Sequence, residues 1–455
     1  MDNGNEFERV TAWVGANVGG TVVGIRRQAR WRPVWFVDVE RDGDARTVMV
    51  RGDRTDAAPL FPLNHEMKFQ QLLEEDGIPV PHVYGWCDDP RAFVMDIVPG
   101  ENNFDHATDA ERQAVMGEYM AILARMHALD PDRYARAGIA RADTPAQSGV
   151  VGMEVYERGY RRTKQRPDPF LEFCLGWLAR NPVDTHGREA PVVWDSGQFH
   201  QQGGRVTAIL DVELGHVGDP MMDLAAFRMR DTVLGFGDMN VLYDQYAKHS
   251  GAPVDMAAIM HHHFAFTLSN QLAFHAALAV PPPTTDYMTN MQWCSETNLF
   301  AIEALAEILG IEELDAVEVP EPRRSPVAAA HEHLVRSLRT IGVADEYGKH
   351  QLRIAFRLAR HLQRFDEIGD ELTDADLDDL HALLGRRPAT WQEGDAALEE
   401  FVLADAGAHD EELLQLFHRR YLRYKLLVGP AGSAMATHHP IQKFSRSSDT
   451  PHTSS

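Results

Sequence analysis

One segment, residues 192–231, constrains the fold of this chain more than any other. A short apolar run ends at Asp195, Gly203–Gly204 predict a hairpin turn, and the apolar strand Val206–Leu210 leads directly into Asp211. We expect this hairpin to bring the two carboxylates to the same end. Metal-assisted phosphoryl transfer needs one carboxylate to orient the attacking hydroxyl and one to hold the magnesium that bridges the nucleotide phosphates. Either aspartate alone also fits a simple turn, so the prediction rests on the pair.

The residues after this hairpin carry a family resemblance. Residues 210–213 read LDVE, and residues 218–225 read GDPMMDLA. The pattern resembles the catalytic core of the aminoglycoside phosphotransferase and choline kinase-like family, whose members are related to protein kinases. The resemblance covers roughly residues 13–310 and is most specific from Asp195 to Ala225. It implies an α+β, two-lobed protein-kinase-like fold, with a small β-rich N-lobe and a mainly helical C-lobe.

The resemblance also implies roles for the residues of the catalytic loop. Asp195 accepts or orients the proton of the substrate hydroxyl, and Asp211 binds Mg²⁺. Where the family has His-Gly-Asp, this chain has Val193-Trp194-Asp195, and the position of the family's metal-binding Asn, counted forward from the aspartate, is His200. Counting back from Asp211 places it on Gln198 instead. We prefer Gln198 because an amide oxygen suits Mg²⁺ better than an imidazole nitrogen.

The first hundred residues are expected to be strand-rich with one helix. Alternating apolar and β-branched residues predict the strands, and Pro79 stops the helix. The predicted elements are strands at residues 34–39 and 47–51, a helix at 63–75, and strands at 83–87 and 92–97. This order matches the small lobe of a kinase.

Four residues of this lobe acquire nucleotide-binding roles through the resemblance. Arg51 stands where kinases have a phosphate-binding lysine, and a guanidinium keeps the charge and binds phosphate with a forked geometry. Glu66 would pair with Arg51 and hold it in position. Main-chain groups at Asp96 and Val98, in the hinge between the lobes, would bind adenine.

The predicted turn between the first two strands departs from the family pattern. It reads RQARWRP at residues 27–33 and contains no glycine, although a close approach of backbone to phosphates favours glycine. Two alternatives remain: Arg30 and Arg32 contact phosphates through their side chains, or they form a solvent-exposed basic turn.

The rest of the chain has helical patterning, and three of its features bear on function. Asp219 and Asp223 are expected to brace the catalytic loop through backbone hydrogen bonds. His127 is expected to be a packing or capping residue. The run His261–His263 is a weak metal signal, because adjacent histidines on a helix point in different directions.

The domain organisation follows from composition along the chain. We expect an N-lobe at residues 1–98, a helical C-lobe at 99–318, a C-terminal all-α domain at 326–430 and a disordered tail at 431–455. The boundary is the proline- and charge-rich stretch EVPEPRRS at 318–325. The C-terminal helices are similar to an uncharacterised domain that accompanies some family members. They would dock a partner, form a homodimer or close over the acceptor site.

Charge and cysteine content restrict the partners and the compartment. The 68 acidic residues outnumber the 44 basic ones, and the formal net charge of −24 argues against nucleic acid or an anionic membrane as a partner. The three cysteines are widely spaced, and no basic, apolar leader begins the chain, so we expect a cytoplasmic protein.

The sequence therefore predicts a phosphotransferase that moves the γ-phosphate of ATP, or GTP, to a hydroxyl of a small molecule, with Mg²⁺ as cofactor. Within the family, acceptors range from aminoglycosides to choline-like alcohols and hydroxyacyl-CoA thioesters. The alternative is a catalytically impaired pseudokinase that acts as a binding or scaffold protein. The glycine-free turn, Arg51 in place of lysine, and the altered loop at residues 194–198 favour that alternative.

Overall fold

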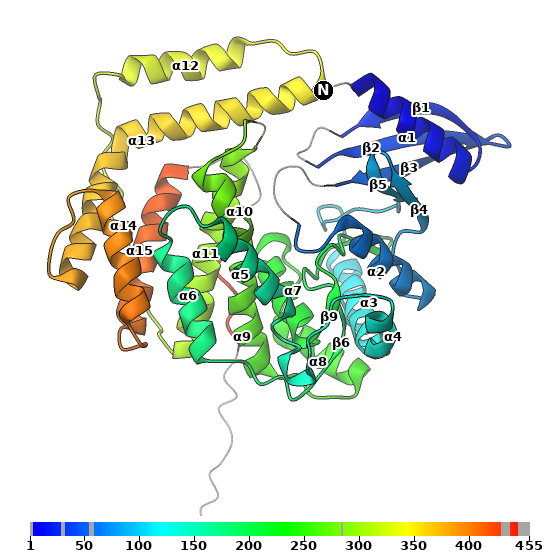
Figure 1. Ribbon diagram of the computed structural model, residues 1–455, viewed down its shortest axis with the longest axis horizontal. Helices are drawn as coiled ribbons and strands as arrows, with labels where there is room; N and C mark the ends of the chain where they lie inside the picture. The colour runs from blue at the N-terminus through cyan, green and yellow to red at the C-terminus, as the bar shows by residue number, and fades with distance from the viewer. Residues whose placement is uncertain (1–2, 29–31, 54–58, 284, 429–436, 445–455) are drawn as a thin grey trace, which may run out of the picture.

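A five-stranded antiparallel sheet forms the core of the N-lobe in the computed structural model, which describes residues 3–28, 32–53, 59–283, 285–428 and 437–444 (Figure 1). The sheet has the order β1-β2-β3-β5-β4. The elements of this lobe are α1 (Asn3–Asn17), β1 (Thr21–Arg27), β2 (Val34–Arg41), β3 (Asp44–Gly52), α2 (Leu63–Glu75), β4 (Val83–Asp88) and β5 (Arg91–Asp96). The predicted strands and the predicted helix are confirmed.

The two helices of the N-lobe cover opposite faces of the sheet. Val48 and Val50 of β3 pack with Val10 and Val14 of α1, whereas Met49 packs in a separate cluster with Leu63 of α2. Successive side chains of a strand point to opposite faces, so this separation is expected for a sheet buried on both sides. The expectation of a single helix in this region was incomplete, because α1 precedes the sheet and buries one face of it.

Helices dominate the C-lobe, and two short β-ladders lie among them. The helices are α3 (Asp109–His127), α4 (Pro131–Arg136), α5 (Val151–Thr163), α6 (Pro169–Arg180), α7 (Met221–Leu234), α8 (Met239–Ser250), α9 (Met256–Thr267), α10 (Ser269–Ala279) and α11 (Tyr287–Leu309), with a 3₁₀ turn at Pro145–Gln147. Strands β6 (Ala190–Val192) and β9 (His216–Gly218) pair with each other, as do β7 (Phe199–Gln202) and β8 (Arg205–Ile209). All four strands are antiparallel to their partners.

Local sequence sets the ends of the helices that support the catalytic segment. Thr108 and Glu111 form a capping box at the start of α3, in which each side chain accepts the other's backbone N–H. Helix α7 follows Asp219-Pro220 and stops at Gly235, whose φ of 65° a glycine adopts without steric cost. These two helices and the β7–β8 hairpin meet in the core cluster that contains Tyr119, Phe199 and Phe227.

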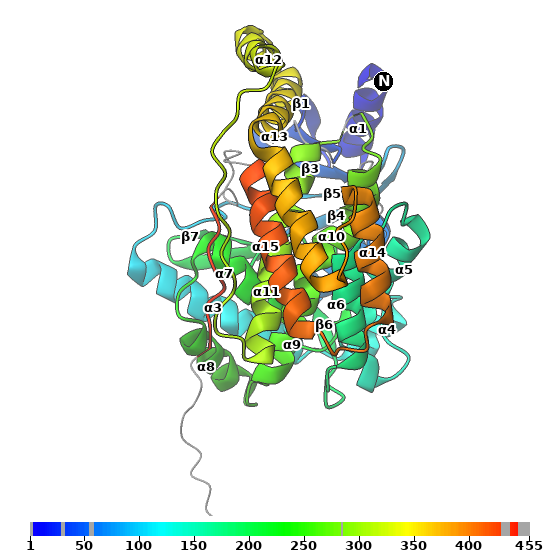
Figure 2. The same cartoon turned by 90° about the vertical axis from the view of Figure 1, so that its left-hand side faces the viewer.

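Four further helices follow the C-lobe: α12 (Ala328–Thr340), α13 (Glu346–Leu384), α14 (Trp391–Ala404) and α15 (Asp410–Val428). Leu377, Leu398 and Phe417 of these helices belong to the same hydrophobic cluster as Phe170 and Phe173 of α6. The second half of α13, together with α14 and α15, therefore shares one core with the C-lobe. Helix α12 and the first half of α13 instead extend beyond that core as a hairpin (Figures 1 and 2).

Residues 437–444 correct one expectation. They were predicted to belong to a disordered tail at 431–455, yet His438 lies 2.8 Å from a Glu296 oxygen and 2.6 Å from a Glu303 oxygen on α11. Ile441 is buried in the cluster that contains α11. The polar composition of this stretch predicted disorder, and its partners on α11, more than 130 residues away in the sequence, could not be predicted from it. The remainder of the predicted tail lies outside the described residues.

Within the described part of the chain, no helix is both long enough and apolar enough to cross a membrane.

Candidate active site

Two sharp turns of the C-lobe carry Asp195 and Asp211. Asp195 follows β6, and Asp211 follows β8, the second strand of the predicted hairpin. Trp194 and Asp211 have positive φ angles of 60° and 54°, a conformation that is costly for non-glycine residues and is concentrated at functional sites. The two loops are tied together, because the Leu210 N–H donates to the Gln198 carbonyl at 2.9 Å. The expected juxtaposition of the two loops is present.

Asp223 holds the loop that carries Asp195. Its carboxylate accepts the backbone N–H of Trp194 at 2.6 Å and that of Val193 at 3.2 Å. His127 lies 3.0 Å from the same carboxylate and contacts the Tyr246 hydroxyl through its other ring nitrogen. The bracing role predicted for Asp223 is therefore confirmed, and His127 links Asp223 to α8.

Asp219 differs from this expectation. It accepts two hydrogen bonds from Arg188, both at 2.9 Å, and lies 3.2 Å from His262. Its backbone contact is with Met221, inside the first turn of α7. The prediction that Asp219 binds the backbone of the catalytic loop was wrong, because its side chain points toward the segment before β6 and toward α9.

A cluster of five charged side chains joins the lobes. Arg51 contacts Glu66 at 2.7 Å, Asp211 at 2.5 Å and Glu213 at 3.5 Å. Arg32 contacts Glu213 at 2.7 Å and Glu66 at 3.8 Å. We call Arg32, Arg51, Glu66, Asp211 and Glu213 the cross-lobe cluster. The predicted pairing of Arg51 with Glu66 is confirmed as a contact.

Burial and charge act in opposite directions on the carboxylates of this cluster. Burial raises the pKa of Glu66, and the charges of Arg51 and Arg32 oppose that rise. Burial by itself would also raise the pKa of Asp211, but Arg51 and Arg32 outweigh it and hold the pKa below its usual value. Asp211 is therefore ionised at neutral pH, as a metal ligand must be.

The position of Arg32 decides between the two alternatives for its role in the turn at 27–33. Only 4% of its surface is exposed, and it lies inside the cross-lobe cluster, so the solvent-exposed alternative was wrong for this residue. Residues 29–31, including Arg30, lie outside the described residues.

Asp195 belongs to a smaller charged group. The Arg230 guanidinium, from α7, forms an ion pair with one of its carboxylate oxygens, and the Gln198 amide donates to the other at 2.8 Å. Burial raises the pKa of Asp195, while Arg230 opposes the rise. Sequence reasoning missed Arg230. The available signal was its spacing: Arg230 follows Asp223 by seven residues on α7, which places both on one helical face.

The contacts of Gln198 and His200 bear on the choice of metal ligand. His200 Nδ1 lies 3.0 Å from the carbonyl of Val98, so this side chain contacts the hinge. Gln198 lies beside Asp195, and because a carboxylate only accepts hydrogen bonds, the amide nitrogen must face it. The amide oxygen of Gln198 is then directed elsewhere. This geometry supports Gln198 over His200.

The oxygen donors here fit a magnesium ion. Asp211 would supply a carboxylate and Gln198 an amide oxygen, and Mg²⁺ in nucleotide sites takes one or two protein ligands beside phosphates and water. The described residues contain no group of three or more His, Cys, Asp or Glu side chains that could hold a metal ion. His261–His263 also form no such group, since His261 contacts the Asn181 carbonyl and His262 contacts Asp219.

The hinge residues lie at the end of β5, as predicted. The Asp96 N–H donates to the His82 carbonyl at 2.9 Å, and the Asp96 carboxylate accepts from the Tyr84 hydroxyl at 2.7 Å. Val98, two residues later, contacts His200 through its carbonyl. Their assignment to adenine binding stays a prediction.

Trp194 occupies the place of the glycine in the family's His-Gly-Asp. Its indole is 1% exposed and packs against His216, Phe266 and Tyr156. A Cβ added at Gly152, on α5, would overlap this indole ring. The loop thus accommodates tryptophan because α5 has no side chain at that point.

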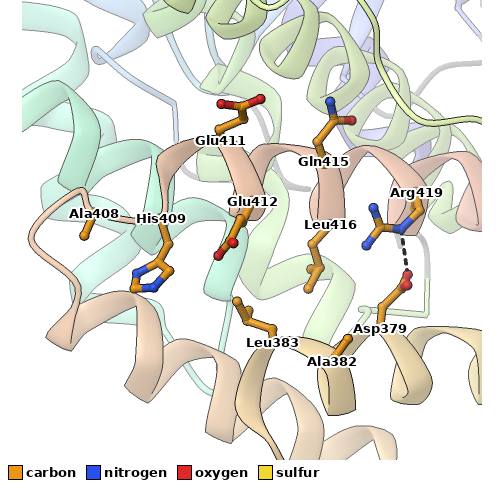
Figure 3. A pocket seen from close by; sticks show the side chains of 10 residues that line it. All are labelled: Asp379, Ala382, Leu383, Ala408, His409, Glu411, Glu412, Gln415, Leu416 and Arg419. Atoms are coloured by element: carbon orange, nitrogen blue, oxygen red, sulfur yellow. Dashed lines mark hydrogen bonds and ion pairs between the residues drawn. The ribbon is translucent and has the colours of Figure 1, made fainter.

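A pocket in the C-terminal helices is separate from these residues (Figure 3). It lies between α13 and α15, and its lining includes Asp379, Glu411, Glu412 and Arg419. Arg419 is paired with Asp379 at 3.0 Å and also contacts Asp315. Because its arginine is already paired and the other charges here are mostly acidic, this pocket is poorly suited to nucleotide phosphates.

Comparison with known proteins gives one family match. The model of a family described as the phosphotransferase enzyme family matches residues 27–258, which is half of the chain. The match spans β2 to the start of α9 and includes the cross-lobe cluster, Asp195 and Arg230.

Curated relatives match a shorter part. Acyl-CoA dehydrogenase family member 11 of Rattus norvegicus is 28% identical over 176 residues, covering 36% of this chain and 22% of the relative. The Gallus gallus protein of the same name is 30% identical over 186 residues, covering 37% of this chain and 23% of the relative. The matched part thus spans less than a quarter of the length of these relatives.

Solved structures show low overall similarity. A macrolide 2'-phosphotransferase from Brachybacterium faecium aligns with a TM-score of 0.44 at 20% identity, covering 59% of this chain and 92% of that chain. An aminoglycoside-3'-phosphotransferase of type VIII aligns with a TM-score of 0.42 at 20% identity, covering 57% of this chain and 98% of that chain.

Proposed function

The chain belongs to the phosphotransferase enzyme family, and from that premise we propose that it transfers the γ-phosphate of ATP, or GTP, to a hydroxyl of a small molecule. The observation that carries this proposal is the cross-lobe cluster. It joins Asp211, which follows the β7–β8 hairpin, to Arg51 of the N-lobe. A backbone hydrogen bond ties the loop of Asp211 to the loop that carries Asp195. A cation and two carboxylates so arranged supply the parts that phosphoryl transfer requires.

Each residue has a defined task in this mechanism. Arg51, fixed by Glu66, exchanges its contact with Asp211 for phosphate oxygens. Asp211 and Gln198 would hold Mg²⁺, which would neutralise charge on the phosphates. Asp195 accepts the proton of the acceptor hydroxyl. The hydroxyl oxygen bonds to the γ-phosphorus, and the bond from that phosphorus to the leaving nucleoside diphosphate breaks.

The first test separates a working nucleotide site from a scaffold. We expect MgATP or MgGTP to raise the thermal midpoint of the full chain by several degrees, and EDTA to abolish the increase. Asp211→Asn should lose the magnesium-dependent part, because it removes the charged metal ligand. Asp244→Asn, an exposed aspartate on α8, is the matched control and should behave as the wild type.

The opposite result would support the pseudokinase alternative. If neither nucleotide shifted the midpoint at millimolar concentration, the cross-lobe cluster would be a structural link between lobes and a search for protein partners would follow. If the magnesium-dependent shift of the thermal midpoint persisted in Asp211→Asn, Asp211 would not be a metal ligand.

A further inference from the structure

The two arginines of the cross-lobe cluster differ from Arg230 in their surroundings. Arg32 and Arg51 share Glu66 and Glu213 within a partly buried network, and Arg51 also contacts Asp211. Arg230 pairs with Asp195 alone among the described carboxylates. Its side chain is 23% exposed, so solvent reaches part of it.

The position of Arg230 is fixed by the loop beneath it. A Cβ added at Gly197 would lie 3.0 Å from the Arg230 side chain and 3.1 Å from Phe236, so the arginine stem lies directly on the glycine. Arg230 Nε is also buried without a hydrogen-bond partner among the described residues. The stem is therefore held in place, while the guanidinium retains unused donor capacity beside Asp195.

Any acceptor must enter this environment. A hydroxyl that gives its proton to Asp195 has to lie within hydrogen-bond reach of the carboxylate, and hence close to the guanidinium bound to that carboxylate. An ammonium group near the hydroxyl would meet a like charge there. A carboxylate or phosphate group would meet a forked, charged donor suited to planar or tetrahedral oxyanions.

We propose that Arg230 selects acceptors that carry an anionic group near the hydroxyl and disfavours cationic ones. The anionic group draws Arg230 away from Asp195, and the freed carboxylate oxygen becomes available for the hydroxyl proton. Arg230 is thus both a specificity determinant and a positioning residue for Asp195. This inference rests on the proposed function.

The test uses four probes with one three-carbon skeleton: glycerate, glycerol 3-phosphate, glycerol and 3-amino-1,2-propanediol. ADP release by the full chain with MgATP is measured above the acceptor-free rate. We expect kcat/KM for at least one anionic probe to exceed that for the aminodiol by tenfold or more, with glycerol between them. Comparison of glycerate with glycerol 3-phosphate distinguishes a carboxylate from a phosphate as the recognised group.

Variants at position 230 connect this preference to the side chain. Arg230→Gln should reduce kcat/KM for the preferred anionic probe at least tenfold and narrow its advantage over the aminodiol. Arg230→Lys should restore the order of the probes, since it restores the charge. Arg205→Gln, an exposed arginine on β8, is the matched control, and thermal midpoints of all variants check folding.

Two results would overturn the inference. One is equal or better turnover of glycerol or the aminodiol; the other is a preference that Arg230→Gln leaves unchanged. Absence of acceptor-dependent ADP release with all four probes also counts against it. If MgATP still raised the thermal midpoint and acceptor-free hydrolysis still depended on Asp211, only the inference about Arg230 would fail; without these, the proposed function would fail too.

Discussion

The cross-lobe cluster and the Asp195–Arg230 pair lie on the same loop system but are built differently. Five side chains from both lobes share contacts in the first, and every one of them except Asp211 has more than one partner among the described residues. In the second, one arginine on α7 pairs with one carboxylate of the C-lobe. In the proposed mechanism, contact between the lobes preorganises the residues that would bind phosphate, whereas an acceptor would replace the single ion pair between Arg230 and Asp195.

Replacing Asp195 should have the largest effect and should separate the two regions. We expect Asp195→Asn to lower the rate of transfer about 10²–10⁴-fold, the range that a general base contributes, because the amide cannot take the proton. Stabilisation by MgATP should stay within error of the wild type, since the cross-lobe cluster is intact. Rates come from ADP release with the best acceptor. Unchanged turnover would show that another group is the base.

Glu66→Gln tests the cooperative character of the cross-lobe cluster. Removing the charge leaves Arg51 and Arg32 with fewer partners in a buried site, and we expect the free energy of unfolding to fall by about 3 kcal/mol. Affinity for nucleotide should also fall, because Arg51 loses its anchor. Denaturant unfolding and nucleotide titration measure the two effects. The control is Glu154→Gln on α5, which is exposed. Equal stability of both variants would contradict the cooperative description.

The pH dependence of transfer addresses the other region. Burial raises the pKa of Asp195, so the carboxylate needed for catalysis becomes protonated at a higher pH than for an ordinary aspartate. The rate should therefore fall on the acid side at a higher pH than an ordinary aspartate would give. Arg230→Gln removes an opposing positive charge and should move this limb to still higher pH. A limb that moved to lower pH, or that did not move, would show that Arg230 does not act on Asp195.

His438 provides a separate pH effect, on stability alone. The hydrogen bonds and charges of Glu296 and Glu303 overcome burial and raise its pKa to about 9, against about 6.5 in an unfolded chain. Its contribution, about 1–3 kcal/mol, is therefore complete below pH 6.5 and is lost as the pH rises through 9. His438→Gln should flatten the fall of the thermal midpoint over this window. Because this effect is measured as stability and the effect of Asp195 as a transfer rate, the two effects can be measured separately.

Sequence patterns predicted the parts of the molecule that depend on local periodicity or on motif spacing. The helix at 63–75 and the hairpin at Gly203–Gly204 belong to this group, whereas the contact of Arg51 with Glu66 was implied by the family resemblance. Contacts made at long range were not predicted. Arg230 and residues 437–444 owe their partners to packing between distant segments, and the shared core of α6 with α14 and α15 has the same origin. A polar or charged side chain gives no sign in the sequence of which distant partner it will have.

The contact between Trp194 and Gly152 has an evolutionary consequence. The two positions are 42 residues apart, yet the indole occupies the volume that any side chain at 152 would need. A mutation at 152 is therefore tolerated only after the side chain at 194 has become small, and the order of the two changes matters. Descendants of this sequence that acquire a residue larger than glycine at 152 are expected to have first lost the tryptophan.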